Sequence, residues 1–77
     1  MSRRLPSLKP LEVLRALERA GFYVHHQRGS HAQLRHPADS AKRVTVPIHT
    51  GFDIPRGTLR AILKQAGMTP EQFVARL

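Results

Sequence analysis

The spacing of apolar residues changes twice along this chain, and these changes restrict most strongly what it can fold into. Over residues 10–20, apolar side chains recur at three- and four-residue intervals, the spacing of a helix with one apolar side. Over residues 22–46 they alternate with polar side chains, as in strands with one buried face. Helical spacing returns from about residue 53 to 66. The sequence therefore predicts an α+β fold in which helices flank the strands along the chain.

The first helix is expected from Pro10 to Ala20. Proline suits the first helical turn, where its missing N–H would have had no partner. Gly21 supplies the left-handed residue that commonly ends a helix. The apolar side of this helix consists of Val13, Leu14, Leu17 and Ala20.

Three short antiparallel strands are expected next, over about residues 22–27, 31–35 and 43–46. Because facing side chains lie on the same side of a sheet, the alternation excludes a two-residue turn at Arg28-Gly29. It favours a three-residue loop over 28–30, with the second turn over 37–40. The predicted cross-strand pairs are Gln27 with His31, His25 with Gln33, Gln33 with Thr45, and Arg35 with Arg43.

These pairs divide the strand residues between two faces. The apolar face consists of Phe22, Val24, Ala32, Leu34, Val44 and Val46. The polar face consists of His25, His31, Gln33, Arg35, Arg43 and Thr45. The simplest layering packs the helices against the apolar face of the three-stranded sheet and leaves the polar face open.

A loop over 48–52 and two further helices complete the predicted elements. The longer helix runs from about 53 to 66, with Gly67 as its stop and an apolar stripe made by Leu59, Ile62, Leu63 and Ala66. Thr69-Pro70-Glu71-Gln72 carries the capping pattern of a short third helix over about 69–77.

The charge of the chain indicates the kind of partner it meets. Its 77 residues include 13 Lys and Arg against 5 Asp and Glu, a formal charge of +8. An excess of this size favours an anionic partner, whether nucleic acid, an acidic protein or an anionic membrane surface. The length supports one domain over 1–77, with no room for a separate cofactor-binding domain.

Several classes are excluded by what the sequence lacks. No apolar stretch approaches the roughly 20 residues of a membrane span, and Arg3-Arg4 precedes Leu5-Pro6-Ser7 rather than an apolar signal core. The absence of cysteine excludes disulfides and thiolate metal sites, and a small domain without disulfides is expected in the cytoplasm. The remaining histidines show no chelating spacing, and His25 and His26 point to opposite faces, so no metal or other cofactor is expected.

Two sets of basic residues are candidate contacts for an anion. Arg35 opposite Arg43 is an unfavourable pair that either an anion or splaying of both side chains into water relieves. Arg56, Arg60 and Lys64 stand at i, i+4 and i+8 and form a ridge on the second long helix. Such a ridge is often a solvated face. Here, however, Asp53 is the only acid between Asp39 and Glu71, so the ridge has few counter-charges in the sequence and is available to an external polyanion.

His31 is the candidate for proton transfer. Histidine is the side chain that gives and takes protons near neutral pH. A histidine on an exposed strand is usually a surface residue, but His31 follows a glycine that permits close approach, a hydroxyl, and a cation in Arg28-Gly29-Ser30. No Gly-rich nucleotide cradle, carboxylate pair or Ser/His/Asp arrangement competes with it.

Two motifs resemble the HicA (YcfA-like) toxin family. One is the Gly29-Ser30-His31 turn, and the other is the helix Pro55-Arg56-Gly57-Thr58-Leu59-Arg60-Ala61-Ile62-Leu63. Gly21-Phe22 and Arg43-Val44-Thr45-Val46-Pro47 stand with them in the same order, and the similarity runs from about Leu8 to Gly67. Either motif alone would be weak, whereas the two together are specific.

The resemblance implies a fold similar to a double-stranded-RNA-binding domain, with a core over about 8–67 followed by the short helix over about 69–77. It implies the toxin of a type II toxin–antitoxin system, a ribosome-independent mRNA endoribonuclease (mRNA interferase) that a HicB-like antitoxin neutralises. The family's functional histidine maps onto His31. The RNA contacts expected with it are Arg28, Gly29, Ser30, Arg35, Arg43, Arg56, Arg60 and Lys64.

Cleavage without a metal needs a base, an acid and cations on the phosphate, and His31 is expected to be one of the two proton carriers. The second is not identified, although His25 shares the polar face. The alternative is a non-catalytic RNA-binding module that reads RNA through phosphate and 2′-OH contacts. A DNA recognition helix is disfavoured because no helix is joined to the 53–66 helix by the short turn that such a motif requires.

Overall fold

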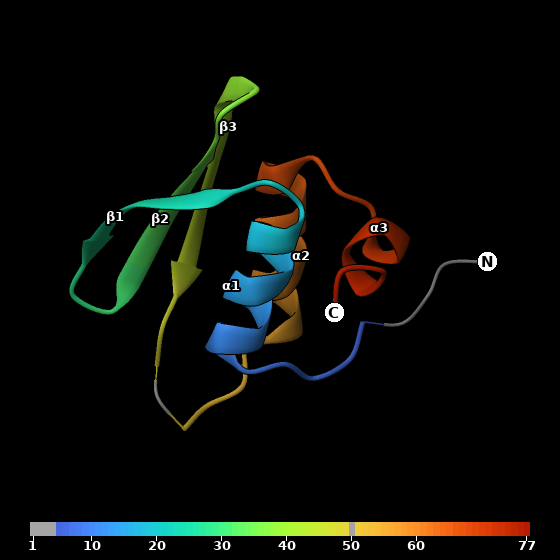
Figure 1. The fold of residues 1–77 in the computed structure, drawn as a ribbon. Coiled ribbons are helices and arrows are strands. Elements are labelled where there is room, and N and C mark those ends of the chain that lie inside the picture. The colour runs from blue at the N-terminus through green and yellow to red at the C-terminus, as the bar shows by residue number, and fades with distance from the viewer. Residues whose placement is uncertain (1–4, 50) are drawn as a thin grey trace.

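The computed structural model describes residues 5–49 and 51–77. Its elements are α1 (Pro10–Arg19), β1 (Tyr23–Arg28), β2 (His31–His36), β3 (Asp39–Pro47), α2 (Arg56–Ala66) and α3 (Pro70–Val74). The predicted α+β fold is confirmed: a helix, three antiparallel strands and two helices, with the helices on one side of an open sheet (Figure 1). Arg3-Arg4 and Thr50, one residue of the predicted loop, lie outside the described residues.

Proline and glycine residues set the limits of both long helices. α1 begins at Pro10 as predicted, and Gly21 follows it with a φ of 102°, a conformation that favours glycine. α2 begins at Arg56 rather than near 53, because Pro55 is extended (φ −59°, ψ 146°) and a proline disfavours helix in the residue before it. Gly67 ends α2 in the left-handed conformation, as predicted.

The short helix α3 has the predicted capping box. The Gln72 N–H donates to Thr69 Oγ1 over 3.1 Å, and the Thr69 N–H donates to Gln72 Oε1 over 2.9 Å. The helix ends at Val74, earlier than predicted, but it is firmly anchored because Phe73 is fully buried. The C-terminal segment is therefore packed into the same core as the rest of the described chain.

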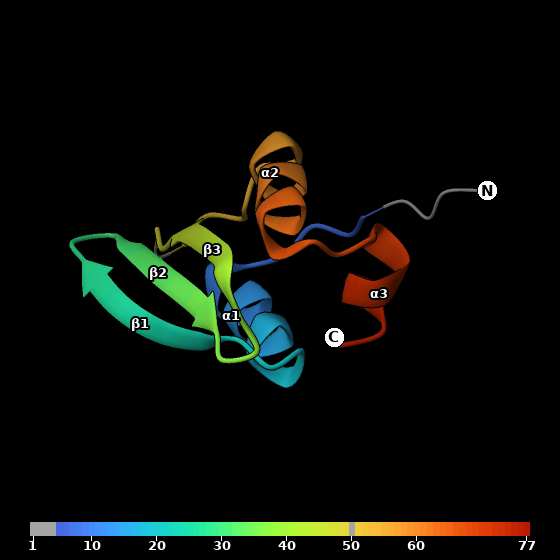
Figure 2. The ribbon, with the colours of Figure 1, turned by 90° about the horizontal axis from the view of Figure 1, so that it is seen from above.

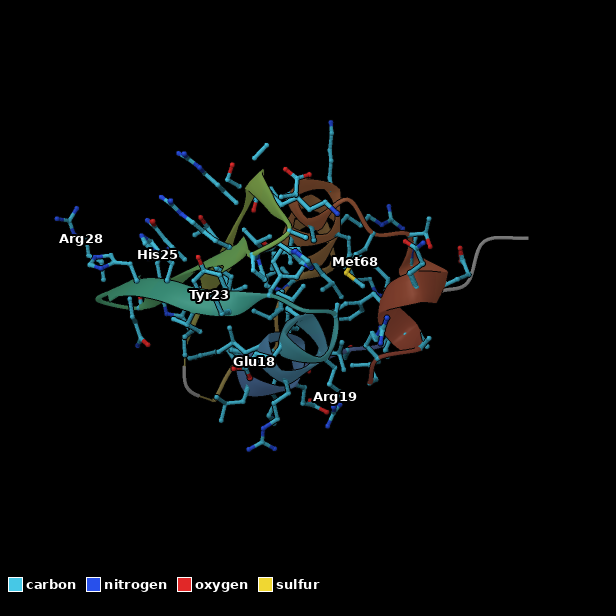
Figure 3. All side chains as sticks on the ribbon, turned by 45° about the horizontal axis from the view of Figure 1, so that its top comes forward. Glu18, Arg19, Tyr23, His25, Arg28 and Met68 are labelled. Atoms are coloured by element: carbon cyan, nitrogen blue, oxygen red, sulfur yellow. The ribbon has the colours of Figure 1, made fainter. Side chains whose placement is uncertain are left out.

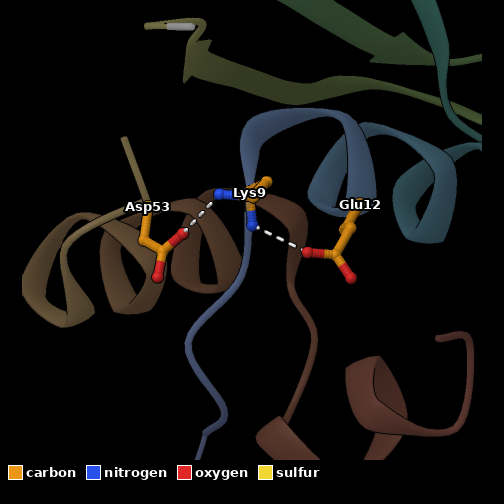
Figure 4. A network of polar contacts seen from close by, with 3 residues as sticks. All are labelled: Lys9, Glu12 and Asp53. Atoms are coloured by element: carbon orange, nitrogen blue, oxygen red, sulfur yellow. Dashed lines mark hydrogen bonds and ion pairs between the residues drawn. The ribbon is translucent and has the colours of Figure 1, made fainter. Parts of the chain in front are cut away.

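A small polar network joins the starts of the two long helices (Figure 4). The Lys9 N–H donates to Glu12 Oε1 over 2.9 Å, which satisfies one unpaired donor at the start of α1. Lys9 Nζ lies 3.4 Å from Asp53 Oδ1. Both of these side chains are at least half exposed, so this ion pair contributes little stability. Its consequence is that the acid nearest to α2 is already paired with Lys9.

The register of β2 against β3 is as predicted, but that of β1 against β2 is not. Arg35 faces Arg43, as expected. In the other hairpin Arg28, not Gln27, faces His31, and the connection is the two-residue turn Gly29-Ser30 rather than a three-residue loop. The physical reason is a bulge in β1 between Val24 and His26, which breaks the strict alternation on which the prediction rested.

The bulge also changes which β1 residues lie on the open face. His26, not His25, faces Gln33, and Tyr23 faces Arg35. The His25 ring lies 6.4 Å from the Tyr23 ring, and both side chains point away from α1 (Figure 3). His25 and His26 therefore share the open face rather than pointing to opposite faces.

The core lies between the sheet and the helices. Besides the stripes of α1 and α2 it contains Phe22, Ala32, Leu34, Val44 and Val46 from the predicted apolar face, together with Leu5, Leu8, Ile54 and Phe73. Val24 is the exception, because it remains 42% exposed on the outer strand, β1. Viewed from above, β1 is the strand farthest from α2, whereas β3 lies beside it (Figure 2).

The outer edge of β3 is covered by α2. The Thr45 N–H, which has no strand partner on that side, donates to Gln65 Oε1 over 3.0 Å. An unpaired strand edge is a template for pairing with another chain, and a polar side chain from a helix removes that possibility here. α2 is thereby placed against the edge of the open face as well as against the core.

Candidate nucleic-acid interface

The register arranges the open face of the sheet in three cross-strand rows. They are Arg28, His31 and Pro47; His26, Gln33 and Thr45; and Tyr23, Arg35 and Arg43. Cations therefore occur at both ends of this face, with hydrogen-bonding side chains between them. Facing Cα atoms in such rows are about 4.5–5.5 Å apart. The side chains of one row therefore lie close enough together for a single nucleotide to contact them.

His31 opens into a shallow groove between the sheet and α2. The groove has a volume of about 410 Å³, and besides His31 its lining consists of Thr45, Pro47, Gly57, Thr58, Ala61, Ile62 and Gln65. Gly57 has no atom within 4 Å of the place where a Cβ would stand, so this wall of α2 is open to an incoming ligand. The groove combines an imidazole, hydroxyls and an amide with a wide mouth.

The His31 side chain is exposed and makes no hydrogen bond within residues 5–49 and 51–77. Its neighbour is the ring of His49, with the two ring centres 6.4 Å apart and the planes at 80°. His49 lies just after β3, and its spacing in the sequence gave no reason to connect it with His31. Among the functional candidates, His49 is the one that sequence reasoning missed.

The Arg28-Gly29-Ser30 turn lies at the tip of the β1–β2 hairpin. Arg28 faces His31 across the strands, and its side chain stands at the far end of the hairpin from the helices (Figure 3). Gly29 has a φ of 56° and open space around it, so a ligand can approach the backbone there. The Ser30 carbonyl accepts a hydrogen bond from the Ile48 N–H, which ties this turn to the segment after β3.

Arg35 and Arg43 form a pair two rows away from His31. Arg35 is four positions along β2 from His31, which is about 14 Å at 3.4 Å per residue. Arg35 is half-buried and Arg43 is exposed. Arg35 and Arg43 are therefore remote from His31, whereas Arg28 is the arginine beside that histidine.

The ridge on α2 does not line the His31 groove. At about 100° per residue, the row of Arg56, Arg60 and Lys64 lies roughly 130° around the helix from Thr58, Ala61 and Gln65. All three cations are exposed, and none makes an ion pair within the described part of the chain. The predicted basic residues thus form two separate surfaces: the open face and the outer flank of α2.

His36 stands at the other end of β2 and has a different environment. The Ala38 N–H donates to its Nδ1 over 3.1 Å, so the proton is on Nε2, which lies 3.3 Å from the Ala20 carbonyl oxygen. The centres of the His36 and Phe22 rings are 5.0 Å apart, with the ring planes nearly perpendicular. This histidine joins the end of α1 to the β2–β3 turn.

No cluster of three or more His, Asp or Glu side chains in residues 5–49 and 51–77 has the geometry to hold a metal ion. Nor does this part of the chain contain a helix that could cross a membrane.

Comparison with known proteins identifies the family. The model of the HicA toxin of bacterial toxin–antitoxin systems matches residues 11–68, which is most of the chain. The match includes the His31 turn, all three strands and α2. The chain therefore belongs to the HicA toxin family, and membership of a toxin–antitoxin system implies an antitoxin partner. No curated protein matches the chain in sequence.

Proposed function

We propose that this protein is a ribosome-independent mRNA endoribonuclease, the toxin of a HicA/HicB-type system, acting in the cytoplasm without a metal. The observation that carries the proposal is the exposed His31, which lines a groove that also contains hydroxyls and an amide, on a face whose first and last rows contain arginines. His31 transfers a proton between the RNA and water, and Arg28 beside it binds the phosphate that reacts.

The remaining candidate residues act in binding. Gly29 and Ser30 admit the backbone of the RNA at the hairpin tip, and Arg35 with Arg43 binds a phosphate farther along the strand. A shallow groove suits single-stranded RNA, whose backbone and unstacked bases reach an open surface. The 2′-OH as nucleophile confines the reaction to RNA.

The direct test is cleavage of a purified mRNA transcript by the wild-type protein and by His31→Ala, without ribosomes and with a chelator present. Loss of one proton-transfer group lowers the rate by about 10²- to 10⁴-fold. His25→Ala is a matched control, because it removes an imidazole from the same face outside the groove. Cleavage at the wild-type rate by His31→Ala would refute the catalytic role.

One observation favours the alternative, a non-catalytic RNA-binding module. No described residue orients the His31 ring by a hydrogen bond, whereas catalytic histidines are usually held by a second group. A binding module would retain RNA at low salt, leave it intact, and tolerate His31→Asn. An intact transcript after prolonged incubation with wild-type protein would decide for this alternative.

The antitoxin is proposed to be a HicB-like protein with an acidic surface that covers the open face and the flank of α2. The charge of +8 attracts such a surface from a distance, so association should slow markedly as salt is raised. Stopped-flow association rates at low and high salt measure this. Rates that do not change with salt would remove the electrostatic part of the proposal.

A further inference from the structure

We propose that His49 is the second proton-transfer group of the His31 site, so that the two histidines divide the acid and base roles in RNA cleavage. The proposal rests on the function proposed above. It assigns a role to a residue that follows β3 and belongs to no motif recognised in the sequence.

The backbone directs His49 to the same face as His31. Pro47 faces His31 on the open face, and the next hydrogen bond, from the Ile48 N–H to the Ser30 carbonyl, continues the ladder by one position. Ile48 is partly buried against the core, as alternation requires. The following side chain, His49, therefore returns to the open side as a diagonal neighbour of His31.

A further contact restrains His49 from the other side. The Phe52 N–H donates to the His49 carbonyl oxygen over 3.3 Å, closing a turn directly after this residue. His49 itself is exposed and lines a hollow next to the groove, with Pro47 shared between the two. The backbone is thus restrained on both sides of an imidazole that remains open to solvent.

The separation of the rings suits two groups that serve one phosphate. Each proton-transfer atom must come within about 2.6–3.2 Å of its own oxygen, and the two oxygens lie on opposite sides of the phosphorus, so the two imidazoles need a gap between them that the phosphate can enter. The observed ring centres are 6.4 Å apart. Direct hydrogen bonding between the two rings, by contrast, would leave no access for substrate oxygens.

The reaction balances with these two groups alone. The neutral imidazole of one histidine takes the proton of the 2′-OH as the 2′-oxygen forms its bond to phosphorus. The imidazolium of the other gives its proton to the 5′-oxygen as the bond from phosphorus to that oxygen breaks. The products are a 2′,3′-cyclic phosphate and a 5′-hydroxyl, and proton exchange with water restores both histidines.

His25, the other histidine considered from sequence, does not satisfy this geometry. It lies at the bulge of β1, and its ring neighbour is Tyr23, whereas the ring neighbour of His31 is His49. Its variant His25→Ala is therefore the matched control for His49→Ala. Both variants remove an exposed imidazole.

The first experiment measures single-turnover cleavage of an RNA oligonucleotide that contains a cleavage site mapped with the wild-type protein. His49→Ala should lower the rate of the bound complex by about 10²- to 10⁴-fold. His25→Ala should remain within about threefold of wild type, since the groove is intact. Circular dichroism and thermal melting of each variant establish that it is folded.

The second experiment uses the same oligonucleotide with sulfur replacing the 5′-oxygen at the scissile phosphate. A thiolate leaves without a proton, so the variant that lacks the acid regains most of the wild-type rate, whereas the variant that lacks the base does not. Rescue of one of His31→Ala and His49→Ala, but not both, is expected.

The outcomes separate this inference from the function on which it rests. If wild-type protein leaves RNA intact, the proposed function fails. If wild-type protein cleaves and His49→Ala cleaves equally fast, or binds RNA more weakly with an unchanged rate once bound, His49 is not a proton carrier. Equal response of both variants to the sulfur substrate would also overturn the division of roles.

Discussion

The two ends of β2 carry the same side chain in opposite circumstances. His31, at the start of the strand, is exposed, lines a groove and makes no hydrogen bond within the described residues, with the His49 ring as its aromatic neighbour. His36, at the end, is half-buried, contacts Phe22 and has both ring nitrogens within hydrogen-bonding distance of backbone groups. One end leaves an imidazole open to solvent, whereas the other uses it to hold elements together.

The different environments of His31 and His36 follow from the elements that surround each end of β2. Behind His36 stand the end of α1 and the α3 segment, so polar atoms of the backbone are close enough to be joined. Beside His31 are a two-residue turn and the small residues Gly57 and Ala61 of α2, which leave room. A histidine of β2 is therefore exposed or structural according to its neighbours, not its type.

The largest expected effect is on the cleavage rate, and it should distinguish a substitution of His31 from one of His36. His31→Ala should lose about 10²- to 10⁴-fold in cleavage rate with an unchanged melting temperature. His36→Ala should lose about 1–3 kcal/mol of stability, from the hydrogen bonds and the aromatic contact, with near-normal cleavage by the folded fraction. Urea titration measures the stability of both variants, and single-turnover cleavage measures their rates. If the two variants lost stability and cleavage rate to the same extent, the contrast between the two histidines would be wrong.

The next effect concerns the short helix α3, which packs against α1. Phe73→Ala removes a fully buried ring and should cost about 3–5 kcal/mol. Phe73→Leu, which retains most of the apolar volume, should cost clearly less. Chemical denaturation of the two variants provides the measurement. Little change in Phe73→Ala would mean that the anchoring of α3 contributes little to the stability of the core.

A smaller effect is expected where Gly21 meets His36. A Cβ at Gly21 would lie 2.6 Å from His36 Nε2, and its φ of 102° is unfavourable for other residues, so Gly21→Ala should cost about 1–3 kcal/mol. Adding His36→Ala removes the clash but not the backbone strain. A double-mutant cycle should therefore show a non-additive recovery. Strict additivity would show that the close contact contributes nothing.

The smallest expected effect is the loss of stability on substitution of Gln65, which lines the His31 groove. Gln65→Ala removes the partner of the exposed Thr45 N–H and should cost about 0.5–1.5 kcal/mol. It also uncovers the β3 edge, so self-association should rise at high protein concentration. Thermal melting measures the loss of stability, and analytical ultracentrifugation measures the self-association. A fully monomeric variant would indicate that α2 blocks the edge by its bulk rather than by this bond.

Local patterns in the sequence predicted those features that depend on neighbours in the chain. Pro10 and Gly21 mark the limits of α1, Thr69 and Gln72 form their capping box, and alternation alone placed Arg35 opposite Arg43. These features require no knowledge of how distant elements pack.

The parts of the site that the sequence did not predict depend on distant contacts. His36 bonds to Ala20, 16 residues away, and Gln65 bonds to Thr45, 20 residues away. Pairing His49 with His31 required the position of the chain after β3. The bulge in β1 was missed because it interrupts the alternation on which the register was predicted. The roles of His31 and the arginines remain predictions.

The bulge in β1 gives this hairpin an unusual tolerance to a change in chain length. Tyr23 and Val24 face Arg35 and Leu34, and His26 faces Gln33, so His25 is the one residue between them that occupies no pairing position. Removing it would leave every existing cross-strand pair in place and convert the bulged strand into a regular one. A single-residue deletion, which in an ordinary strand turns every later side chain to the wrong face, would here straighten the strand and keep the groove intact.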